Sequence, residues 1–355
     1  MKFEMSNKFF EQVQSFESYQ SVVRAAGILN LNKMLDLTGV FKGKKMEFKR
    51  TVTAIAVFLG VSFSFLGAQA SELRIGTASQ GGAFYPVGQA ISTLVNKHAK
   101  GLTMVPIVTG GSVANPRLVN KGEVDIAITN NNLAVLANKG VGPYKKSGKM
   151  NLRALGSLHF SVLHMMTLDG SAITGIADLK GKRVAVGPAG GGTIPFLKQV
   201  LGLQGLKIED ITPSFLSYSD GFSQLADGNV DAAFALSGYP AGAVMQAQAN
   251  KKLKFIPLSD ADVATALGKY KNYNKVIVPK NVYNTARDGV LLGVNNMLIV
   301  DSAMSEDVAF AITKAIYSNM DEFRKENALA KQIEPERSKR LKIPLHPGAA
   351  KFFGN

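Results

Sequence analysis

The 355-residue sequence contains no cysteine, and this absence alone excludes several kinds of site. Without a thiol the chain has no disulfide bond, no thiolate zinc site, no iron–sulfur cluster and no cysteine nucleophile. Histidine is scarce as well, and the four histidines form neither an HExxH pair nor a tight cluster of ligands: His98, His159, His164 and His346. We therefore expect no metal site and interpret the histidines as structural or surface residues.

The motifs of common catalytic and nucleotide sites are also missing. No G-x-S-x-G elbow occurs. Five residues separate Gly175 from Gly181-Lys182, where a phosphate-binding loop has four, and Arg183 replaces its Ser or Thr. The segment Gly187–Gly190 lacks the G-x-G-x-x-G spacing. We expect no catalytic residue and no cofactor, although an acid pair assembled only by folding would not be visible at this stage.

Acidic residues are outnumbered, at 26 Asp+Glu against 41 Lys+Arg, which gives a net charge of +15. This excess of positive charge favours anionic partners. The basic residues are scattered, and no stripe of basic and aromatic residues accompanies them, so we expect no nucleic acid partner. The hydrophobic fraction of 46% excludes a wholly disordered chain, and the length suggests two domains.

Residues 46–70 show the order of a secretory signal peptide. The basic segment Met46–Arg50 precedes an uncharged run over 51–66, and Ala68–Ala70 supplies the small residues that a signal peptidase reads. The alternative is a membrane anchor, which needs about 20 apolar residues. The run barely reaches that length and ends in small and polar residues. We therefore predict cleavage before Ser71 and a periplasmic protein.

Residues 1–45 precede this signal and have no clear apolar period. Two further methionines, Met34 and Met46, could serve as start codons. We interpret residues 1–45 as a misassigned start, and a genuine long leader is the alternative.

After Ser71 the sequence alternates short strands with helices. Leu73–Thr77 is a predicted strand, and Tyr85–His98 is a predicted helix with apolar residues on one face. Met104–Val108 is a predicted strand, and its Pro106 indicates an edge strand or the end of a strand. Repeated strand–loop–helix units predict a parallel sheet with helices on its faces, and ligands bind such sheets at the carboxyl ends of the strands. A helix is also expected to begin near Asn115-Pro116, with Asn115 or Ser112 as its cap.

The same pattern returns about 110 residues later. Gly228–Phe234 resembles Gly122–Ile128 at an offset of 106, and Gly187 follows Gly76 at an offset of 111. Two lobes of similar build would explain both offsets, and chance similarity of short G-x-V-D strings is the alternative. Glycine-rich loops and helix N-termini facing each other across a cleft could hold a small anion by main-chain N–H groups. Plain tight turns would leave the same glycine pattern.

Several segments resemble a known family. Ile173–Gly187 is similar to the start of the second lobe in periplasmic solute-binding proteins, and with Gly190–Thr193 it resembles the TAXI-type receptors of TRAP transporters. Further segments of this resemblance, which spans almost all of the predicted mature chain, are Gly81–Pro86, Thr109–Asn115, Gly122–Ile128, Ser237–Pro240 and His346–Ala350.

The resemblance implies an α/β fold of the type II periplasmic-binding-protein kind, with two α/β lobes joined by a hinge around a ligand cleft. It implies a receptor that captures a small organic anion, such as a dicarboxylate, a 2-oxo acid or an acidic amino acid, and we expect this receptor to be a monomer. The receptor would deliver this anion to an ion-driven TRAP membrane permease and would not be an enzyme. A receptor of another transporter class, a sensor, or an exported enzyme on the same fold are the alternatives.

The resemblance also places ligand contacts in the loops of both lobes. The residues concerned are Thr77, Ser79, Gly81, Gly82, Tyr85, Gly111, Ser112, Asn130, Asn131, Gly190, Gly192, Thr193 and Tyr239. Three departures from the family pattern affect the identity of the ligand: Ala78–Gln80 in the first loop, Asn130-Asn131, and the triple glycine Gly190–Gly192. No position clearly supplies the single arginine by which the other class of TRAP receptor grips a carboxylate.

The chain order gives the expected lobe boundaries. Lobe 1 comprises residues 71–164 and 289–355, and lobe 2 comprises residues 165–288. The strand Val162–Leu168 is expected to cross into lobe 2, and residues 290–300 to return. A helix over Ser305–Lys325 would then complete lobe 1.

Overall fold

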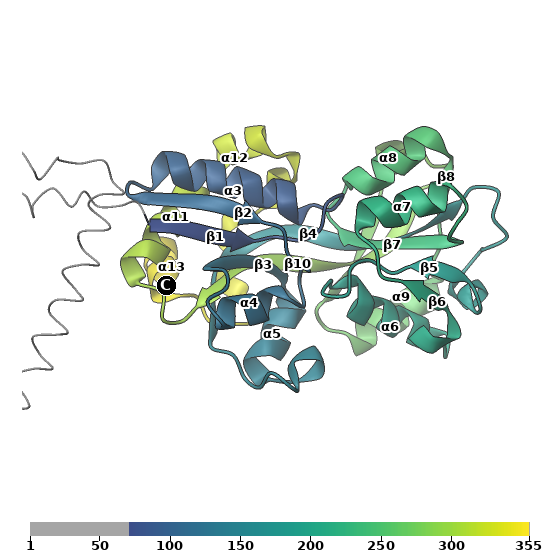
Figure 1. The fold of residues 1–355 in the computed structure, drawn as a ribbon, viewed down its shortest axis with the longest axis horizontal. Helices are drawn as coiled ribbons and strands as arrows, with labels where there is room; N and C mark the ends of the chain where they lie inside the picture. The colour runs from purple at the N-terminus through teal and green to yellow at the C-terminus, as the bar shows by residue number, and fades with distance from the viewer. Residues whose placement is uncertain (1–70, 355) are drawn as a thin grey trace, which may run out of the picture. The chain divides into compact units, whose positions relative to one another are not determined.

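The computed structural model describes residues 71–354 (Figure 1). The predicted signal peptide at 46–70 and the segment 1–45 lie outside the described residues. Within the described part of the chain, no helix has the length and apolar character needed to cross a membrane.

The described residues form a single ten-stranded mixed sheet in the order β2-β1-β3-β10-β4-β7-β5-β6, with β8 paired to β4 and β9 paired to β10. The strands are β1 (Ser71–Gly76), β2 (Leu102–Ile107), β3 (Ile126–Asn130), β4 (Leu152–Leu168), β5 (Arg183–Ala185), β6 (Thr212–Ser214), β7 (Ala232–Ser237), β8 (Leu253–Phe255), β9 (Tyr273–Val278) and β10 (Gly289–Asp301). Strands β1, β2 and β3 are mutually parallel, as are β5, β6 and β7, whereas β4 and β10 run antiparallel to their neighbours.

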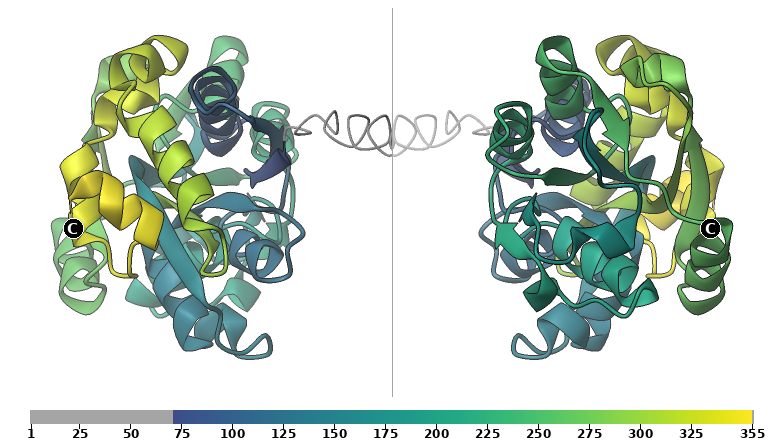
Figure 2. Two further views of the ribbon diagram at one scale, coloured as in Figure 1. Left: turned by 90° about the vertical axis from the view of Figure 1, so that its left-hand side faces the viewer. Right: turned by 90° about the vertical axis from the view of Figure 1, so that its right-hand side faces the viewer.

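Helices cover both faces of the sheet, as the end views show (Figure 2). The α-helices are α3 (Phe84–His98), α4 (Asn115–Asn120), α5 (Asn131–Lys139), α6 (Thr193–Leu203), α7 (Tyr218–Ala226), α8 (Gly242–Asn250), α9 (Asp260–Lys269), α10 (Lys280–Tyr283), α11 (Glu306–Tyr317), α12 (Met320–Glu326) and α13 (Pro347–Phe353). Short 3-10 helices occupy Gly142–Tyr144, Ile176–Leu179, Ile208–Asp210, Ala328–Gln332 and Pro335–Arg340.

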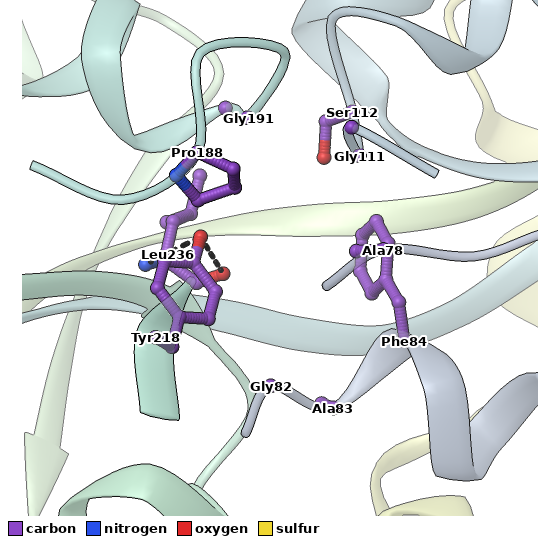
Figure 3. A pocket seen from close by; sticks show the side chains of 12 residues that line it. Ala78, Gly82, Ala83, Phe84, Gly111, Ser112, Pro188, Gly191, Tyr218 and Leu236 are labelled. Atoms are coloured by element: carbon purple, nitrogen blue, oxygen red, sulfur yellow. Dashed lines mark hydrogen bonds between the residues drawn. The ribbon is translucent and has the colours of Figure 1, made fainter. Parts of the chain in front are cut away.

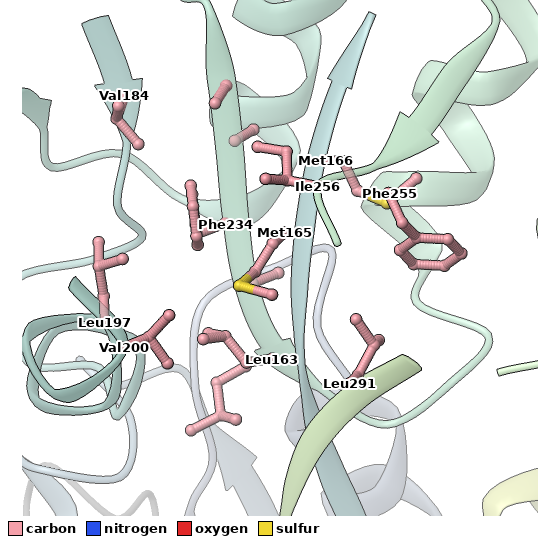
Figure 4. Close-up of a cluster of buried hydrophobic side chains, with 14 of the residues drawn as sticks. Leu163, Met165, Met166, Val184, Leu197, Val200, Phe234, Phe255, Ile256 and Leu291 are labelled. Atoms are coloured by element: carbon pink, nitrogen blue, oxygen red, sulfur yellow. The ribbon is translucent and has the colours of Figure 1, made fainter. Parts of the chain in front are cut away.

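Separate hydrophobic cores lie on the two sides of the long strands β4 and β10. Around β5, β7 and α6 one large cluster includes Phe234 and Leu197 (Figure 4). Around β1–β3 two clusters lie on opposite faces of the sheet. Strand β4 contributes Leu158 to the latter group and Val162 to the former. The predicted α/β class with two lobes is therefore confirmed. The change of core on β4 supports our proposed lobe boundary near residue 164.

The first lobe forms around β1–β3 and the second around β5–β7, and they repeat one structural unit. In the first, Asp125 accepts a hydrogen bond from the Arg74 main-chain N–H at 2.7 Å, and the Arg74 guanidinium donates to the Gly122 carbonyl at 2.9 Å. In the second, Asp231 accepts from the Arg183 main-chain N–H at 2.8 Å, and the Arg183 guanidinium donates to the Gly228 carbonyl at 3.0 Å.

This arginine–aspartate unit confirms the offset of 106 and corrects the offset of 111. Strand pairing joins Gly76 to Ala127 in the first lobe and Ala185 to Ala233 in the second. Because Ala127 and Ala233 are 106 residues apart, Gly76 corresponds to Ala185 and not to Gly187.

Most of the local predictions are confirmed. Helix α3 buries the predicted stripe, and β2 with its Pro106 lies at the edge of the sheet. The expected helix over Ser305–Lys325 is instead two helices, because the chain leaves helical hydrogen bonding at Ser318 and restarts at Met320.

The predicted caps of α4 are wrong. Its N-cap is Ala114, and neither Asn115 nor Ser112 caps it with a side chain. The Asn115 amide is fully buried and donates to the carbonyls of Gly76, Thr77 and Ile128 at 3.3, 2.8 and 2.6 Å. These carbonyls lie at the ends of β1 and β3, so Asn115 ties two strands together instead of capping a helix.

Candidate functional site

A small cavity lies between the two lobes, at the carboxyl ends of the parallel strands (Figure 3). Tyr218, Leu236 and Pro188 form one side, and Ser112, Ala78 and Phe84 lie opposite. The full lining is Ala78, Gly82, Ala83, Phe84, Gly110, Gly111, Ser112, Pro188, Gly191, Gly192, Tyr218 and Leu236. The free volume of about 10 Å³ accommodates roughly one water molecule. An organic solute would therefore enter only if the lobes moved apart.

The lining carries no acidic, basic or histidine side chain. Its polarity comes from the Ser112 hydroxyl, the buried Tyr218 hydroxyl and main-chain groups at the starts of helices. Helix α3 begins at Phe84, α6 at Thr193 and α7 at Tyr218. Helix N-termini present free N–H groups and about half a unit of positive charge each. The cavity is thus suited to an anion bound largely by the main chain.

Hydrogen bonds donated by main-chain N–H groups join the lobes directly around this cavity. The Gly190 carbonyl of lobe 2 accepts from the N–H groups of Val113 and Ala114 at 2.9 and 3.1 Å. The Ala83 N–H donates to the Ser237 hydroxyl at 2.9 Å. The Ala243 N–H donates to the Gly81 carbonyl at 3.0 Å. The structure is therefore a closed arrangement of the two lobes.

Glycines make this closure sterically feasible. A Cβ atom on Gly190 would lie 3.0 Å from the Gly110 Cα atom, and one on Gly110 would lie 3.1 Å from the Gly190 Cα atom. A Cβ on Gly192 would collide with the Asn130 side chain and approach Leu236 to 3.0 Å. Side chains at these positions would hold the lobes apart.

Four predicted residues line the cavity itself: Gly82, Gly111, Ser112 and Gly192. Gly81 and Gly190 lie beside it and make the contacts between the lobes. Gly81 and Gly111 have φ values of +84° and +98°, a region that side chains rarely adopt. The glycine-rich loops of both lobes thus meet, as the sequence suggested.

The two predicted threonines use their hydroxyl groups for hydrogen bonds within the protein, around the cavity. The buried Thr77 hydroxyl donates to the Ile107 carbonyl at 2.7 Å, which fixes the loop after β1 to the edge strand. The Thr193 and Tyr218 hydroxyls lie 2.7 Å apart, and the Leu236 N–H donates to both at 3.2 Å. Burial raises the pKa of Tyr218, so its hydroxyl stays protonated. Thr193 therefore positions the Tyr218 wall and does not itself line the cavity.

Three predicted polar residues carry a buried oxygen that has no hydrogen-bond partner among the described residues: Ser79, Asn130 and Asn131. The Asn130 amide donates to the Asn296 side chain at 2.7 Å, and its oxygen lies against Gly192. Unpaired buried polar atoms are uncommon and costly. Asn130 lies against the lining residue Gly192, so its oxygen becomes available to a bound solute once the lobes separate.

Tyr85 and Tyr239 are not among the lining residues. Both are half-buried, Tyr85 in the first turn of α3 and Tyr239 before the cis peptide bond to Pro240.

Sequence reasoning missed most of the apolar lining, chiefly Phe84, Pro188, Tyr218 and Leu236. A signal for Leu236 existed, because an offset of 106 from Asn130 reaches it. The other three carry no such signal, since an aromatic ring at a helix start is as frequent in a core as in a cleft.

Two histidines, His159 and His164, are fully buried in strand β4, and His164 lies at the proposed boundary between the lobes. His159 packs edge-on against Phe84, with ring centroids 6.0 Å apart. His164 lies 2.8 Å from the Tyr283 hydroxyl. Burial lowers the pKa of His159 to about 3 and that of His164 to about 4, so both are neutral near pH 7. Neither lines the cavity, which agrees with the structural interpretation of the histidines.

The chain belongs to the NMT1-like family, whose model matches residues 75–354. It is also similar to solved structures of binding proteins. The periplasmic aliphatic sulphonate-binding protein SsuA of Escherichia coli is 20% identical, with 80% of this chain and 79% of that one covered and a TM-score of 0.44. The alkanesulfonate-binding protein SsuA of Xanthomonas axonopodis pv. citri, bound to MOPS, is 17% identical, with 80% and 79% covered and a TM-score of 0.43. The ligand-binding component of an ABC-type import system of Staphylococcus aureus is 13% identical, with 80% and 92% covered and a TM-score of 0.46.

Proposed function

We propose that this protein is an extracytoplasmic solute-binding receptor that closes its two lobes around a small organic anion and delivers it to a membrane transporter. The observation that carries the proposal is the cavity between the lobes. It is lined by glycines, helix N-termini and aromatic rings, and by no charged side chain. Such a lining can hold an anion through main-chain N–H groups and can cover an apolar body with Phe84, Tyr218 and Leu236.

A binding role fits this lining better than catalysis. The residues around the cavity include no carboxylate, imidazole, amine or thiol that could act as an acid, a base or a strong nucleophile. The functional event is then a change between an open and a closed conformation. The solute increases the population of the closed conformation because it binds that conformation more tightly.

For the finer identity, we propose a carboxylate as the solute and a TRAP permease of the TAXI type as the partner. The support is the resemblance of Ile173–Gly187 and Gly190–Thr193 to that receptor family. A carboxylate also has the size and charge that a few main-chain N–H groups can satisfy.

The test is a thermal-shift screen of the purified chain with succinate, 2-oxoglutarate, glutamate and related acids. We expect at least one acid to raise the melting temperature in a saturable way and to be recovered unchanged by mass spectrometry. Gly192→Ala should abolish that rise, because its Cβ meets Asn130 and Leu236, whereas Gly202→Ala, which faces open space, should keep it. Consumption of the acid would instead indicate an enzyme.

A second experiment addresses the transporter. Reconstitution of the receptor with its permease in vesicles should give uptake driven by an ion gradient if the partner is a TRAP permease. Uptake that requires ATP would replace this partner with an ABC-type one and leave the receptor role intact.

A further inference from the structure

A second, larger crevice lies apart from the cavity and shares no lining residue with it. Its volume is about 220 Å³. One wall is helix α5 of the first lobe, and the other consists of α6, the end of α9 and the start of β9; these helices lie on the same face of the sheet (Figure 1). The lining residues are Asn132, Val135, Leu136, Gln199, Lys269, Tyr270, Lys271, Asn272 and Tyr273. Both lobes therefore contribute to this crevice.

The charge of the crevice is positive. Lys269 and Lys271 line it, no acidic residue does, and neither lysine forms an ion pair within residues 71–354. Both lysines are exposed; the Lys269 ammonium lies 5.5 Å from the centre of the Tyr270 ring, which keeps its charge next to the aromatic wall of the crevice. Two ammonium groups two residues apart favour a single carboxylate or similar anion between them.

The remaining lining suits a planar ring with a hydroxyl group. Tyr273 stacks on Phe196 with centroids 4.0 Å apart, and Tyr270 lies tilted against Tyr273 at 5.5 Å, which fixes an aromatic wall. The Tyr273 hydroxyl donates to the Gln199 side-chain oxygen, which leaves the Gln199 amide N–H groups available. The Asn132 side-chain oxygen is buried and has no partner among the described residues, so it can accept a hydrogen bond. A volume of roughly 150 Å³ is enough for a benzene molecule, and this crevice exceeds it.

We propose that this crevice binds a small aromatic carboxylate, and that the occupant bridges the two lobes through Asn132 on one side and Lys269 and Lys271 on the other. Because such a ligand contacts both lobes in the closed arrangement, it would stabilise closure from outside the solute cavity. The inference does not depend on the identity of the solute.

The probe for this site is 4-hydroxybenzoate, added to the full chain and followed by the backbone amide NMR signals. We expect saturable shifts at Asn132 and at residues 269–273, while Gly111 and Gly192 report on the solute cavity separately. Benzyl alcohol, which has the ring but no charge, should produce no shifts. Absence of saturable shifts with 4-hydroxybenzoate at residues 269–273 would overturn the proposal without affecting the proposed receptor function.

Matched variants locate the contacts. Lys269→Gln with Lys271→Gln should weaken binding at least tenfold, and the control Lys251→Gln with Lys252→Gln, an exposed pair elsewhere in lobe 2, should leave it unchanged. Asn132→Ala should weaken binding about fivefold, because the occupant loses its contact with the first lobe. Equal losses in the two lysine double variants would indicate unspecific charge attraction, and an unaffected Asn132→Ala would exclude bridging; either result would overturn the proposal.

Discussion

The two lobes share a framework but differ at the surfaces they present to each other. Pro106 in β2 pairs with Ile75, and Pro213 in β6 pairs with Val184, at equivalent places in the two halves of the sheet. The next loop is attached in the same way: the Thr77 N–H donates to the Ile107 carbonyl at 2.9 Å, and the Val186 N–H donates to the Ser214 carbonyl at 3.0 Å. The strands and their connections therefore form one repeated unit.

The difference begins at a single buried contact. In the first lobe Gly76 leaves space for the Asn115 side chain, whose oxygen would lie 3.4 Å from a Cβ at position 76. In the second lobe the equivalent residues are Ala185 and Gly221, and a Cβ on Gly221 would lie 3.0 Å from the Ala185 Cβ. The glycine lies on the strand in the first lobe and on the helix in the second lobe. The second lobe therefore has no room for a polar side chain at this place.

This exchange has a consequence for the cavity. Asn115 and Thr109 organise the loops of the first lobe through polar side chains, and the Thr109 hydroxyl donates to the Asn115 oxygen at 2.6 Å. The second lobe relies on the Thr193–Tyr218 pair and presents Leu236 where the first lobe has Asn130. One lobe therefore offers polar groups to a solute, and the other mainly covers it with apolar surface.

The largest expected effect concerns the two buried histidines of strand β4, of which His159 lies within the first lobe and His164 at the boundary with the second. Their folded pKa values of about 3 and 4 lie below the unfolded value near 6.5, so the unfolded state binds more protons and stability falls as the pH drops below 6.5. Between pH 7 and pH 5 we expect each histidine to cost about 2 kcal/mol of unfolding free energy, and the two together about 4 kcal/mol, measured by urea denaturation.

The two histidines should differ when replaced. His159→Leu and His164→Leu should each remove about half of this pH dependence. Only His164→Leu should also lower stability at pH 7, because the Ala235 carbonyl loses the imidazole as a partner and the Tyr283 hydroxyl keeps only the Ala241 N–H. If His159→Leu left the pH dependence of the unfolding free energy unchanged, protonation of His159 would not be one of its causes.

The next effect tests the buried hydrogen bonds of the Asn115 side chain in the first lobe. Asn115→Leu removes the donor for three buried carbonyls, and we expect a loss of about 3 kcal/mol in the free energy of unfolding. The equivalent change in the second lobe, Gly221→Ala, only crowds Ala185 and should cost about 1 kcal/mol. Similar losses for both variants would mean that the lobes do not differ in the way described.

A smaller effect is expected on closure. In Gly190→Ala the new Cβ meets the main chain of Gly110, so the lobes should stay further apart and solute affinity should fall at least tenfold, about 1.4 kcal/mol. Small-angle scattering should show a larger radius of gyration, even without solute. Gly202→Ala is the control and should change neither quantity.

The sequence predicted the framework better than the site. Hydrophobic periodicity located α3, and Pro106 marked the edge strand, because both depend on contacts that are local or common to all sheets. The role of Asn115 was not predictable, since it depends on carbonyls of β1 and β3 that only the fold brings together. Tyr218 and Pro188 were missed for the same reason: each becomes part of a cleft only when the lobes close.

The smallest effect compares the two arginine–aspartate pairs. The Arg183 guanidinium donates to Asp231 at 2.7 Å, whereas the Arg74 Nε atom lies 3.4 Å from Asp125. Hydrogen bonds from Arg183 lower the pKa of Asp231, so its stabilisation is present above the unfolded pKa near 3.9 and disappears as the pH falls through the lower folded pKa.

Both pairs are partly exposed to solvent, which limits their strength. We expect Asp231→Asn to cost about 1 kcal/mol at pH 7 and Asp125→Asn about half of that, by urea denaturation. The cost of Asp231→Asn should shrink at pH 3, because the carboxyl group it replaces is then increasingly neutral. If Asp125→Asn were the more harmful variant, the shorter contact in the second lobe would not be the stronger one. The common framework would then be held mainly by its main-chain hydrogen bonds.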